Sequence, residues 1–403
     1  MESIVIVGGG QAASSAAAKL RELDSDVNIT ILSAEPVLPY QRPPLSKKYL
    51  SREMPLERLV LRPENWFEEN NISIRLSCEV QQLDLGKNEL TLSDGSKLGY
   101  DKLLIATGSY PRLLPAQIGG DLPNVYALRS VAHADKLAPL LESREPLVIV
   151  GGGYIGLEVA AVSKQFGLEV TLVEMAERIL QRVAAPETSN FFRDLHAKHG
   201  VQILEGVGLD RISQSPNEGL LVQLNNGETV EAGNVLCGIG VAPADELARA
   251  SGLQTDNGII VDEYCQASSP NVFAAGDCAN FDFQGSRIRL ESVPNAIHQA
   301  EVAAVNILGG KEKYVATPWF WSDQYDVKLQ IAGLNSGYDK TVVRPGKREG
   351  AQSVWYYRDE QLIAVDAMND APAFMVARRI IESGKSVPSN DVADPDLNLK
   401  DFV

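Results

Sequence analysis

The chain has 403 residues, a formal net charge of −16, and 44% hydrophobic and 22% charged residues, as is usual for a globular protein. The strong negative charge excludes nucleic acid and anionic membranes as general partners, and no apolar run is long enough for a membrane-spanning helix. With no signal peptide before the first predicted strand, we expect a cytoplasmic protein. The four cysteines and four histidines lack metal-ligand spacing, so we expect no metal site.

The first predicted element is a buried strand over residues 4–7, followed by a glycine-rich turn, a helix over 14–23 and a second strand over 29–35. This order is the dinucleotide-binding fingerprint, in which small residues let the backbone approach a pyrophosphate at a helix N-terminus. Glu35, at the end of the second strand, can accept the hydroxyls of an adenosine ribose. The small residues of this turn are Gly8, Gly10, Ala12 and Ala13.

A third predicted strand, over residues 101–109, closes on a turn of small residues. Pro111 and Pro115 then indicate a domain boundary. The residues of the turn, which we also assign to the first cofactor site, are Ala106, Thr107 and Gly108.

The middle of the chain repeats the fingerprint, with a strand over 147–150, a helix over 157–166 and a strand over 170–174. Glu174 ends the last strand, where a carboxylate binds the ribose hydroxyls of NADH and repels the 2′-phosphate of NADPH. Arg178 and Arg182 follow closely and weaken this inference, because arginines can bind a phosphate. The residues assigned to this turn are Gly151, Gly153, Tyr154, Ile155 and Gly156.

A further strand over residues 269–277 ends in Gly276-Asp277, and a helix follows, from about Glu291 to Leu308. An aspartate at the carboxyl end of this strand is placed to accept a hydrogen bond from a ribityl hydroxyl. NAD has no ribitol, so this feature together with the first turn favours FAD in the first site. The second site then takes the nicotinamide dinucleotide.

These elements predict an α/β fold with two Rossmann-like dinucleotide-binding domains, as in glutathione reductase, and a C-terminal α+β domain. The FAD-binding domain is expected to be discontinuous, over 1–110 and 238–317. The NAD-binding domain is expected over 111–237, with Gly240 at the returning crossing, and the α+β domain over 318–403. The polar stretch from Lys385 to Val403 is typical of a tail.

The cysteines decide between chemistries that share this fold. Disulfide reductases need a redox-active thiol beside the flavin, yet no cysteine lies between Glu35 and Leu50 and no C-x-x-C occurs. The reduced flavin must then pass its electrons outward, and a protein that carries one electron at a time is the natural acceptor.

At this point the sequence resembles the FAD-dependent, NADH-utilising ferredoxin reductases that serve cytochrome P450 and Rieske oxygenase systems, the putidaredoxin reductase and biphenyl dioxygenase reductase type. The resemblance covers almost the full length, and its most specific motif is the run Pro-Tyr-Gln-Arg-Pro-Pro-Leu-Ser-Lys over residues 39–47. It implies a ferredoxin–NAD+ reductase that transfers a hydride from NADH to FAD and single electrons to a [2Fe–2S] ferredoxin.

The resemblance also implies roles for individual residues. Lys47 would lie near the reactive edge of the flavin, and Trp321 would lie by the flavin from the C-terminal domain. In the mechanism that we expect, Lys47 balances the negative charge that develops on the flavin and is paired with Glu158. The other positions implied to contact FAD are Arg42, Val80, Arg129, Asp277 and Val293. The positions implied to contact NADH are Ile155, Glu158, Glu174 and Arg182.

Each of these residues has a structural alternative. Lys47 could be a surface lysine, Glu158 a helix-face carboxylate and Trp321 a core residue. The fold also leaves two other functions open, an NADH oxidase and an NADH-sensing flavoprotein. Turnover of NADH with and without a ferredoxin separates them.

Small ferredoxins are usually acidic, so docking on this acidic protein requires a local basic patch. Two clusters are the candidates: Arg287, Arg289, Lys311 and Lys313, and Arg344, Lys347 and Arg348.

Overall fold

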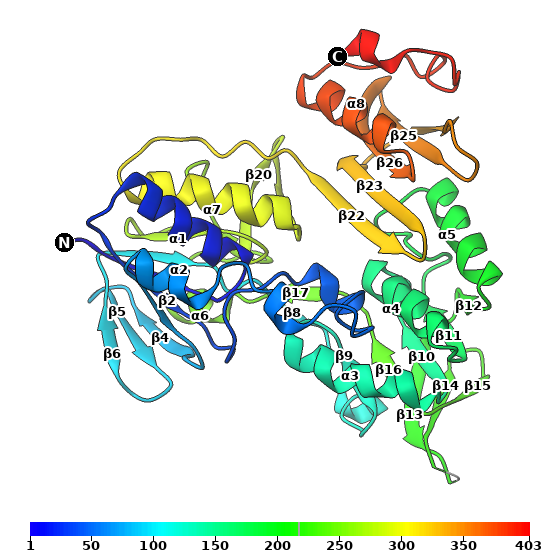
Figure 1. Cartoon of the computed structure of the whole chain (residues 1–403), viewed down its shortest axis with the longest axis horizontal. Coiled ribbons are helices and arrows are strands. Elements are labelled where there is room, and N and C mark those ends of the chain that lie inside the picture. Colours follow the sequence, from blue (N-terminus) through cyan, green and yellow to red (C-terminus); the bar gives the residue numbers. More distant parts are fainter. Residues whose placement is uncertain (217) are drawn as a thin grey trace. The chain divides into compact units, whose positions relative to one another are not determined.

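The computed structural model describes residues 1–216 and 218–403, which form two compact units (Figure 1). The first unit comprises residues 1–41, 56–110 and 241–318. The second comprises residues 42–55, 111–240 and 319–403. Residues 42–55 therefore group with the middle of the chain, whereas the sequence placed them in the FAD-binding domain. The division into three domains stays a prediction.

The first unit is built on a five-stranded parallel sheet of order β19-β7-β1-β2-β3. Its strands are β1 (Ser3–Val7), β2 (Asn28–Leu32), β3 (Ile72–Arg75), β7 (Lys102–Ile105) and β19 (Val272–Ala274). Its helices are α1 (Gln11–Leu23), α2 (Glu64–Glu69), α6 (Glu246–Ala250) and α7 (Val293–Ile307). Smaller sheets contain β4 (Val80–Asp84), β5 (Glu89–Leu92), β6 (Lys97–Gly99), β8 (Ser109–Pro111), β17 (Val241–Pro243), β18 (Ile259–Ile260), β20 (Ala279–Phe283) and β21 (Ser286–Ile288).

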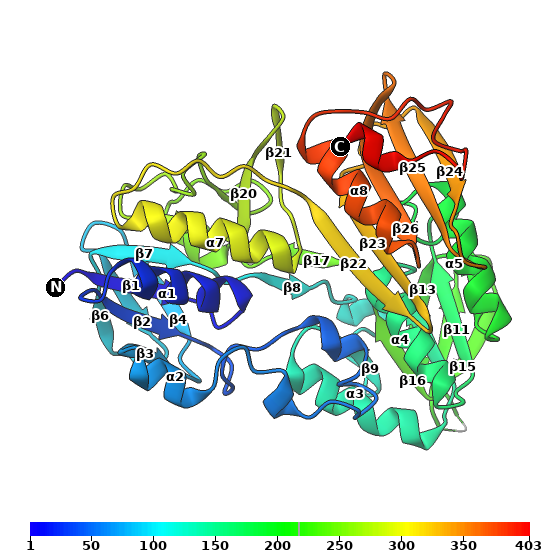
Figure 2. The ribbon, with the colours of Figure 1, turned by 45° about the horizontal axis from the view of Figure 1, so that its top comes forward.

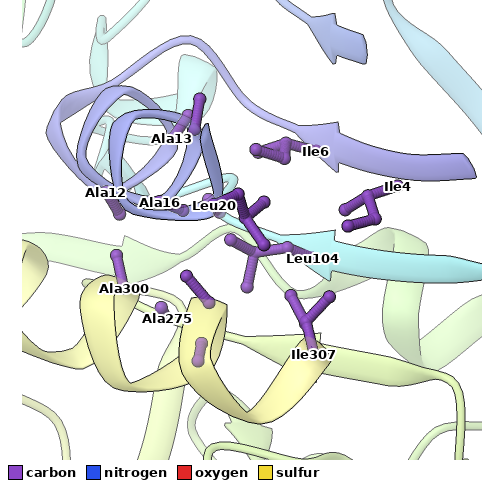
Figure 3. Packing of buried hydrophobic residues seen from close by; sticks show 14 of the residues in the cluster. Ile4, Ile6, Ala12, Ala13, Ala16, Leu20, Leu104, Ala275, Ala300 and Ile307 are labelled. Atoms are coloured by element: carbon purple, nitrogen blue, oxygen red, sulfur yellow. The ribbon is translucent and has the colours of Figure 1, made fainter. Parts of the chain in front are cut away.

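The inner strands β1 and β7 and the strand β19 are almost entirely apolar because both faces of the sheet are covered, whereas the edge strand β3 alternates with polar residues. Ile4 and Ile6 of β1 pack against α1 and α7, whereas Val5 and Val7 face the cluster that contains β4 and β5. Figure 3 shows why the two helices approach closely: alanines such as Ala16 of α1 and Ala300 of α7 form their contact (Figure 3). The observed α7 confirms the helix predicted after Glu291, and Pro294 lies in its first turn.

The second unit repeats this arrangement in a parallel sheet of order β12-β11-β10-β16-β9. Its strands are β9 (Val125–Ala127), β10 (Leu147–Val150), β11 (Val170–Glu174), β12 (Gln202–Glu205) and β16 (Asn234–Cys237). Its helices are α3 (Val131–Ser143), α4 (Tyr154–Gln165) and α5 (Pro186–Lys198). An antiparallel sheet of β13 (Leu209–Gln214), β14 (Leu220–Leu224) and β15 (Thr229–Ala232) packs against one face.

The end of the chain adds a five-stranded antiparallel sheet to the second unit, with α8 (Ala371–Glu382) against β23 and β26 (Figure 2). Its strands are β22 (Trp319–Gln324), β23 (Val327–Gly333), β24 (Lys340–Pro345), β25 (Gln352–Arg358) and β26 (Gln361–Met368). This confirms the predicted C-terminal α+β domain. Short 3-10 turns complete the unit at η1 (Pro43–Ser46), η3 (Ala116–Ile118) and η4 (Leu399–Phe402), and the first unit holds η2 (Leu56–Arg58).

The interpretation of residues 385–403 as a tail was wrong, because this segment packs onto the domain. Val387 and Val392 are fully buried, and the Arg344 guanidinium donates to several backbone carbonyls of the segment. Arg344 is only 6% exposed. A guanidinium has five donors in a planar fork, which suits it to fixing the irregular stretch that precedes η4.

Candidate functional site

The first glycine turn joins β1 to α1 with a geometry that only small residues permit. Gly8 has φ +128°, and a Cβ there would lie 2.1 Å from the Ala106 carbonyl oxygen of the adjacent strand end. A Cβ on Gly9 would lie 2.1 Å from the Ser33 Oγ. Gly10 differs, because its Cβ would meet no atom within 4 Å. The protein is tightly packed behind this turn and open in front of Gly10, as a bound pyrophosphate requires.

The second glycine turn, between β10 and α4, reproduces this geometry. Gly151 has φ +110°, and a Cβ there would lie 2.5 Å from the Gly238 carbonyl oxygen. Gly153 is again open, with nothing within 4 Å of an added Cβ. A Cβ on Gly156 would clash with the Gly151 carbonyl at 2.3 Å, which explains the third glycine. The two turns are therefore equivalent sites in separate units.

Both helices begin at their turn, earlier than the sequence indicated. We predicted starts at Ser14 and Leu157, but α1 begins at Gln11 and α4 at Tyr154. The N-cap residues are Gly10 and Gly153, and neither has a side chain to bond the first helical N–H groups. Those groups and the positive end of the helix dipole thus remain available to the phosphates of a dinucleotide.

An acidic residue lies beside each turn. The Glu174 carboxylate, at the end of β11, accepts hydrogen bonds from the Gly152 and Ala176 N–H groups, both at 2.7 Å. Glu35 lies beyond β2, which ends at Leu32 and not at Glu35 as predicted, and its carboxylate accepts a hydrogen bond from the Tyr40 hydroxyl at 2.7 Å. The Glu174 carboxylate has lone pairs left for ribose hydroxyls.

The carboxyl end of β19 carries the aspartate that favoured a flavin. Gly276 adopts φ +83° and its N–H donates to Gln299 Oε1, which fixes the turn that presents Asp277. The Asp277 carboxylate accepts a hydrogen bond from the Ser109 hydroxyl at 2.8 Å. Gly276 also approaches the Ala12 side chain of α1, so this turn and the first glycine turn are neighbours. The residues of this unit therefore fit the pyrophosphate and ribityl parts of FAD.

We expect Asp277→Ala to weaken FAD binding about tenfold, because it removes a carboxylate acceptor worth about 1–2 kcal/mol. Asp277→Asn keeps an acceptor oxygen and should retain more of the cofactor. The measurement is a fluorescence titration of the apoprotein of each variant with FAD. Equal affinity of the alanine variant and the native protein would remove Asp277 from the site.

A buried ion pair lies in the second unit. Lys47 Nζ is 2.7 Å from Glu158 Oε2, and Glu158 is only 4% exposed on α4. Lys47 also donates to the Pro43 carbonyl, because η1 ends just before it. The pairing suggested for Lys47 and Glu158 is thus present. The ion pair therefore holds the ammonium of Lys47 at a defined position in the second unit.

Trp321, the third residue expected near the reacting rings, lies on the opposite face of its strand from this ion pair. Trp321 and Ser322 are successive residues of β22, so their side chains point to opposite faces of the sheet. Ser322 bonds Glu158, whereas Trp321 packs beside Trp319 with ring centroids 5.5 Å apart. The sheet therefore directs Trp321 away from the ion pair.

The remaining predicted residues divide between the two units. Arg42 donates to the Arg129 carbonyl at 2.9 Å, so these two predicted FAD contacts are neighbours in the second unit. Arg182 lies over Gly240, where an added Cβ would approach its guanidinium at 3.5 Å.

In the first unit, Val80 packs against the sheet core and Val293 begins α7. The Thr107 hydroxyl donates to the Ala244 carbonyl beside Gly108.

Several polar residues that support these sites escaped the sequence analysis. They are Ser46, Ser109, Gln299 and Ser322, each of which bonds a predicted residue or its immediate turn. An isolated serine or glutamine has no distinguishing pattern. Ser46, inside the specific run over residues 39–47, and Ser109, at the end of the predicted strand over 101–109, lay in segments that the sequence had singled out, but neither was assigned a role.

The four cysteines have no disulfide partner in the described residues. Cys265 and Cys278 are fully buried, and burial raises the pKa of every one of the four thiols. A raised pKa disfavours the thiolate, which is the reactive form. The structure thus offers no activated thiol for disulfide chemistry among these residues.

We therefore expect a variant with all four cysteines replaced by alanine to keep its rate of flavin reduction by NADH within about twofold. Its stability should fall, since Cys265 and Cys278 leave small cavities in the core. Stopped-flow reduction of the FAD-loaded variant checks this. Loss of the rate with fold and FAD content intact would point to a thiol mechanism.

Comparison with known proteins identifies the class. Residues 2–300 match the family model described as pyridine nucleotide-disulphide oxidoreductase, and residues 319–403 match the model described as reductase C-terminal. The chain belongs to the pyridine nucleotide-disulphide oxidoreductase family, and it is an oxidoreductase that uses FAD and a nicotinamide dinucleotide. Within the described residues, no helix is both long and apolar enough to cross a membrane.

Individual relatives narrow the class further. The chain is 40% identical to rhodocoxin reductase of Rhodococcus erythropolis, covering 99% of this chain and 93% of that protein. It is 38% identical to putidaredoxin reductase of Pseudomonas putida, covering 100% and 97%. Among solved structures, the covalent putidaredoxin reductase–putidaredoxin complex aligns with a TM-score of 0.95 at 38% identity, over 100% of this chain and 98% of that one.

Proposed function

We propose that this protein oxidises NADH and passes the electrons, through FAD, one at a time to a [2Fe–2S] ferredoxin that supplies a cytochrome P450 or Rieske-type oxygenase. The observation that carries the proposal is the combination of two open dinucleotide turns with a buried Lys47–Glu158 pair and no activated thiol in the described residues. The names of the relatives, rhodocoxin and putidaredoxin reductases among them, agree with it. NADH is a cytoplasmic metabolite, so we place the activity in the cytoplasm.

The residues of this chain bind and orient, and they need not transfer a proton. When bound, FAD supplies the chemistry of accepting a hydride and releasing electrons singly. The turns at Gly10 and Gly153 hold the two pyrophosphates, and alignment of the reacting rings provides most of the acceleration. Lys47 opposes the negative charge that develops, and Glu158 fixes the ammonium in place.

The test is reduction of a panel of [2Fe–2S] ferredoxins by NADH with the FAD-loaded protein. We expect one or more to be reduced far faster than oxygen is consumed. Rapid oxygen consumption with no dependence on any ferredoxin would instead indicate an NADH oxidase. Binding of NADH without turnover of either acceptor would indicate a sensing flavoprotein.

We propose NADH over NADPH because of Glu174. Its carboxylate is held by the Gly152 and Ala176 N–H groups, where a 2′-phosphate would meet it. The Arg178 guanidinium is directed toward α5, since its Nη1 donates to the Ala184 carbonyl and the Ser189 hydroxyl, which makes it the weaker candidate for a phosphate ligand. Arg182 is exposed beside Gly240 and is the stronger candidate for a phosphate ligand.

Glu174→Ala should reduce the NADH-to-NADPH ratio of kcat/KM about tenfold, because it removes a repulsion of about 1.4 kcal/mol. Glu177→Ala is the matched control, since Glu177 is a nearby exposed carboxylate. Steady-state kinetics with both dinucleotides measure the effect. A native enzyme that prefers NADPH would show that Arg182 binds the phosphate.

Some of the basic residues that the sequence offered for ferredoxin docking are already bound within the protein. Arg344 is buried, and Arg289 is bonded to the Asp277 carbonyl and to Glu291, so neither belongs to a free basic patch. Lys313 pairs with Glu263. Arg287 donates to the Val261 and Asn280 carbonyls but is exposed, as are Lys311, Lys347 and Arg348. We propose charge reversal at Arg287 and Lys311 of the first unit, and separately at Lys347 and Arg348 of the second unit, as the first tests in ferredoxin kinetics.

A further inference from the structure

The buried carboxylate of Glu158 receives more donors than an ion pair alone supplies. Its Oε2 accepts from Lys47 Nζ at 2.7 Å and from the Ser46 hydroxyl at 2.5 Å. Its Oε1 accepts from the Ser322 hydroxyl at 2.6 Å. Ser322 comes from β22, in the C-terminal part of the second unit, and is fully buried. One strand of the antiparallel sheet therefore supplies a donor to the Lys47–Glu158 pair.

Ser322 is itself the end of a hydrogen-bonded chain. Gln324, two residues further on the same face of β22, donates from Nε2 to the Ser322 Oγ at 3.2 Å. Gln324 Oε1 lies 2.8 Å from His196 Nε2 on α5, and the Tyr325 hydroxyl lies 3.4 Å from His196 Nδ1. Ser322, Gln324 and His196 are each fully buried, so no water competes for these bonds.

The direction of donation in this chain is fixed by chemistry. Gln324 Oε1 can only accept, so His196 Nε2 must carry its proton and Nδ1 must accept from Tyr325. Gln324 Nε2 can only donate, so the Ser322 proton is directed to Glu158. Burial lowers the pKa of His196 to about 4, which keeps this neutral tautomer near neutral pH. Each donor in the chain, beginning with Tyr325, thus points toward the Glu158 carboxylate. Hydrogen bonds in such a chain polarise and strengthen one another.

We propose that Ser322 is a positioning residue for hydride transfer: backed by Gln324 and His196, it holds the Glu158 carboxylate and, through it, the Lys47 ammonium. This rests on the proposed function, in which Lys47 faces the flavin. A buried carboxylate oxygen that loses its donor moves or takes up water, and the ammonium bound to the same carboxylate loses its fixed place. The C-terminal sheet thereby becomes part of the reductive centre.

The test is anaerobic stopped-flow reduction of the FAD-loaded enzyme by NADH. In Ser322→Ala, the limiting rate of flavin reduction should fall about tenfold, while the Kd for NADH stays within about twofold. Ser322→Cys, whose thiol is a weak donor, should give an intermediate rate and keeps the test available if the alanine variant fails to fold. Ser163→Ala is the matched control, because Ser163 is a buried hydroxyl of α4 for which we find no hydrogen-bond partner among the described residues.

A double-mutant cycle shows whether Ser322 acts through Glu158. In a Glu158→Ala background, which leaves the Ser322 hydroxyl no side-chain acceptor at position 158, Ser322→Ala should cause little further slowing. Equal slowing in both backgrounds, or no more slowing than in Ser163→Ala, would overturn the proposal. A native rate in Glu158→Ala would overturn both this proposal and the role of the ion pair. If the pattern holds but no ferredoxin is reduced, the proposed acceptor fails and the positioning role stands.

Discussion

Gly153→Val should abolish tight binding of NADH while leaving the flavin in place, and Gly10→Val should lose the flavin while the second turn still binds NADH. Each valine would stand where a pyrophosphate approaches its helix N-terminus. We expect the affinity for the corresponding dinucleotide to fall about a hundredfold, or about 2.7 kcal/mol. The measurements are the FAD content of each purified variant and the Kd for NADH from an equilibrium binding titration, which does not depend on the flavin.

These two substitutions should affect ligand binding and not folding, because the protein itself tolerates a side chain at both positions. A Cβ on either glycine meets nothing within 4 Å, and the backbone at Gly153, with φ −82° and ψ 178°, is extended. The free energy of unfolding of the apoprotein should therefore change by no more than about 1 kcal/mol, the cost of a poor N-cap. Gly8→Ala is the contrast, since its Cβ would clash with the Ala106 carbonyl at 2.1 Å and disrupt the fold.

Two outcomes would contradict the assignment of FAD to the first turn and NADH to the second. If Gly153→Val lost FAD and kept NADH, the cofactors would be exchanged between the units. If both variants kept both cofactors, neither turn would bind a pyrophosphate.

The sequence predicted the repeated strand–turn–helix units well because that signal is local. An apolar run such as Leu147–Val150, followed at once by three glycines, has few other interpretations, and the observed β10 has those same bounds. The helix starts were wrong because a glycine N-cap lacks the serine, threonine or aspartate that usually indicates a helix N-terminus. The extent of β2 was overestimated because residues Ser33 and Ala34 carry no strong turn signal.

What the sequence could not show depends on contacts between distant segments. The run over residues 39–47 predicted Lys47 as functional. That Lys47 groups with α4 in the second unit depends on contacts between segments far apart in the sequence. Arg344 and the segment from Lys385 onward each have the composition of exposed chain. Only the folded domain shows that the Arg344 guanidinium binds backbone carbonyls of that segment. Ser322 is an ordinary serine until β22 places it against Glu158.

Lys47→Met should both destabilise the protein and slow its reduction by NADH. The substitution leaves Glu158, 4% exposed, as a buried carboxylate without its cation, which costs about 3 kcal/mol of the free energy of unfolding. Loss of the charge that opposes the developing negative charge on the flavin should slow hydride transfer about a hundredfold. Chemical denaturation and stopped-flow flavin reduction measure the two effects separately. Lys48→Met is the matched control, because Lys48 is the exposed neighbour.

The double variant Lys47→Met/Glu158→Gln separates structure from catalysis. Neutralising Glu158 removes the uncompensated charge, so most of the lost stability should return, and the Ser46 and Ser322 hydroxyls still have an amide to bond. The rate of flavin reduction should not return, because no ammonium faces the flavin. Recovery of the rate together with the stability would make the pair a purely structural element and would remove Lys47 from the reductive centre.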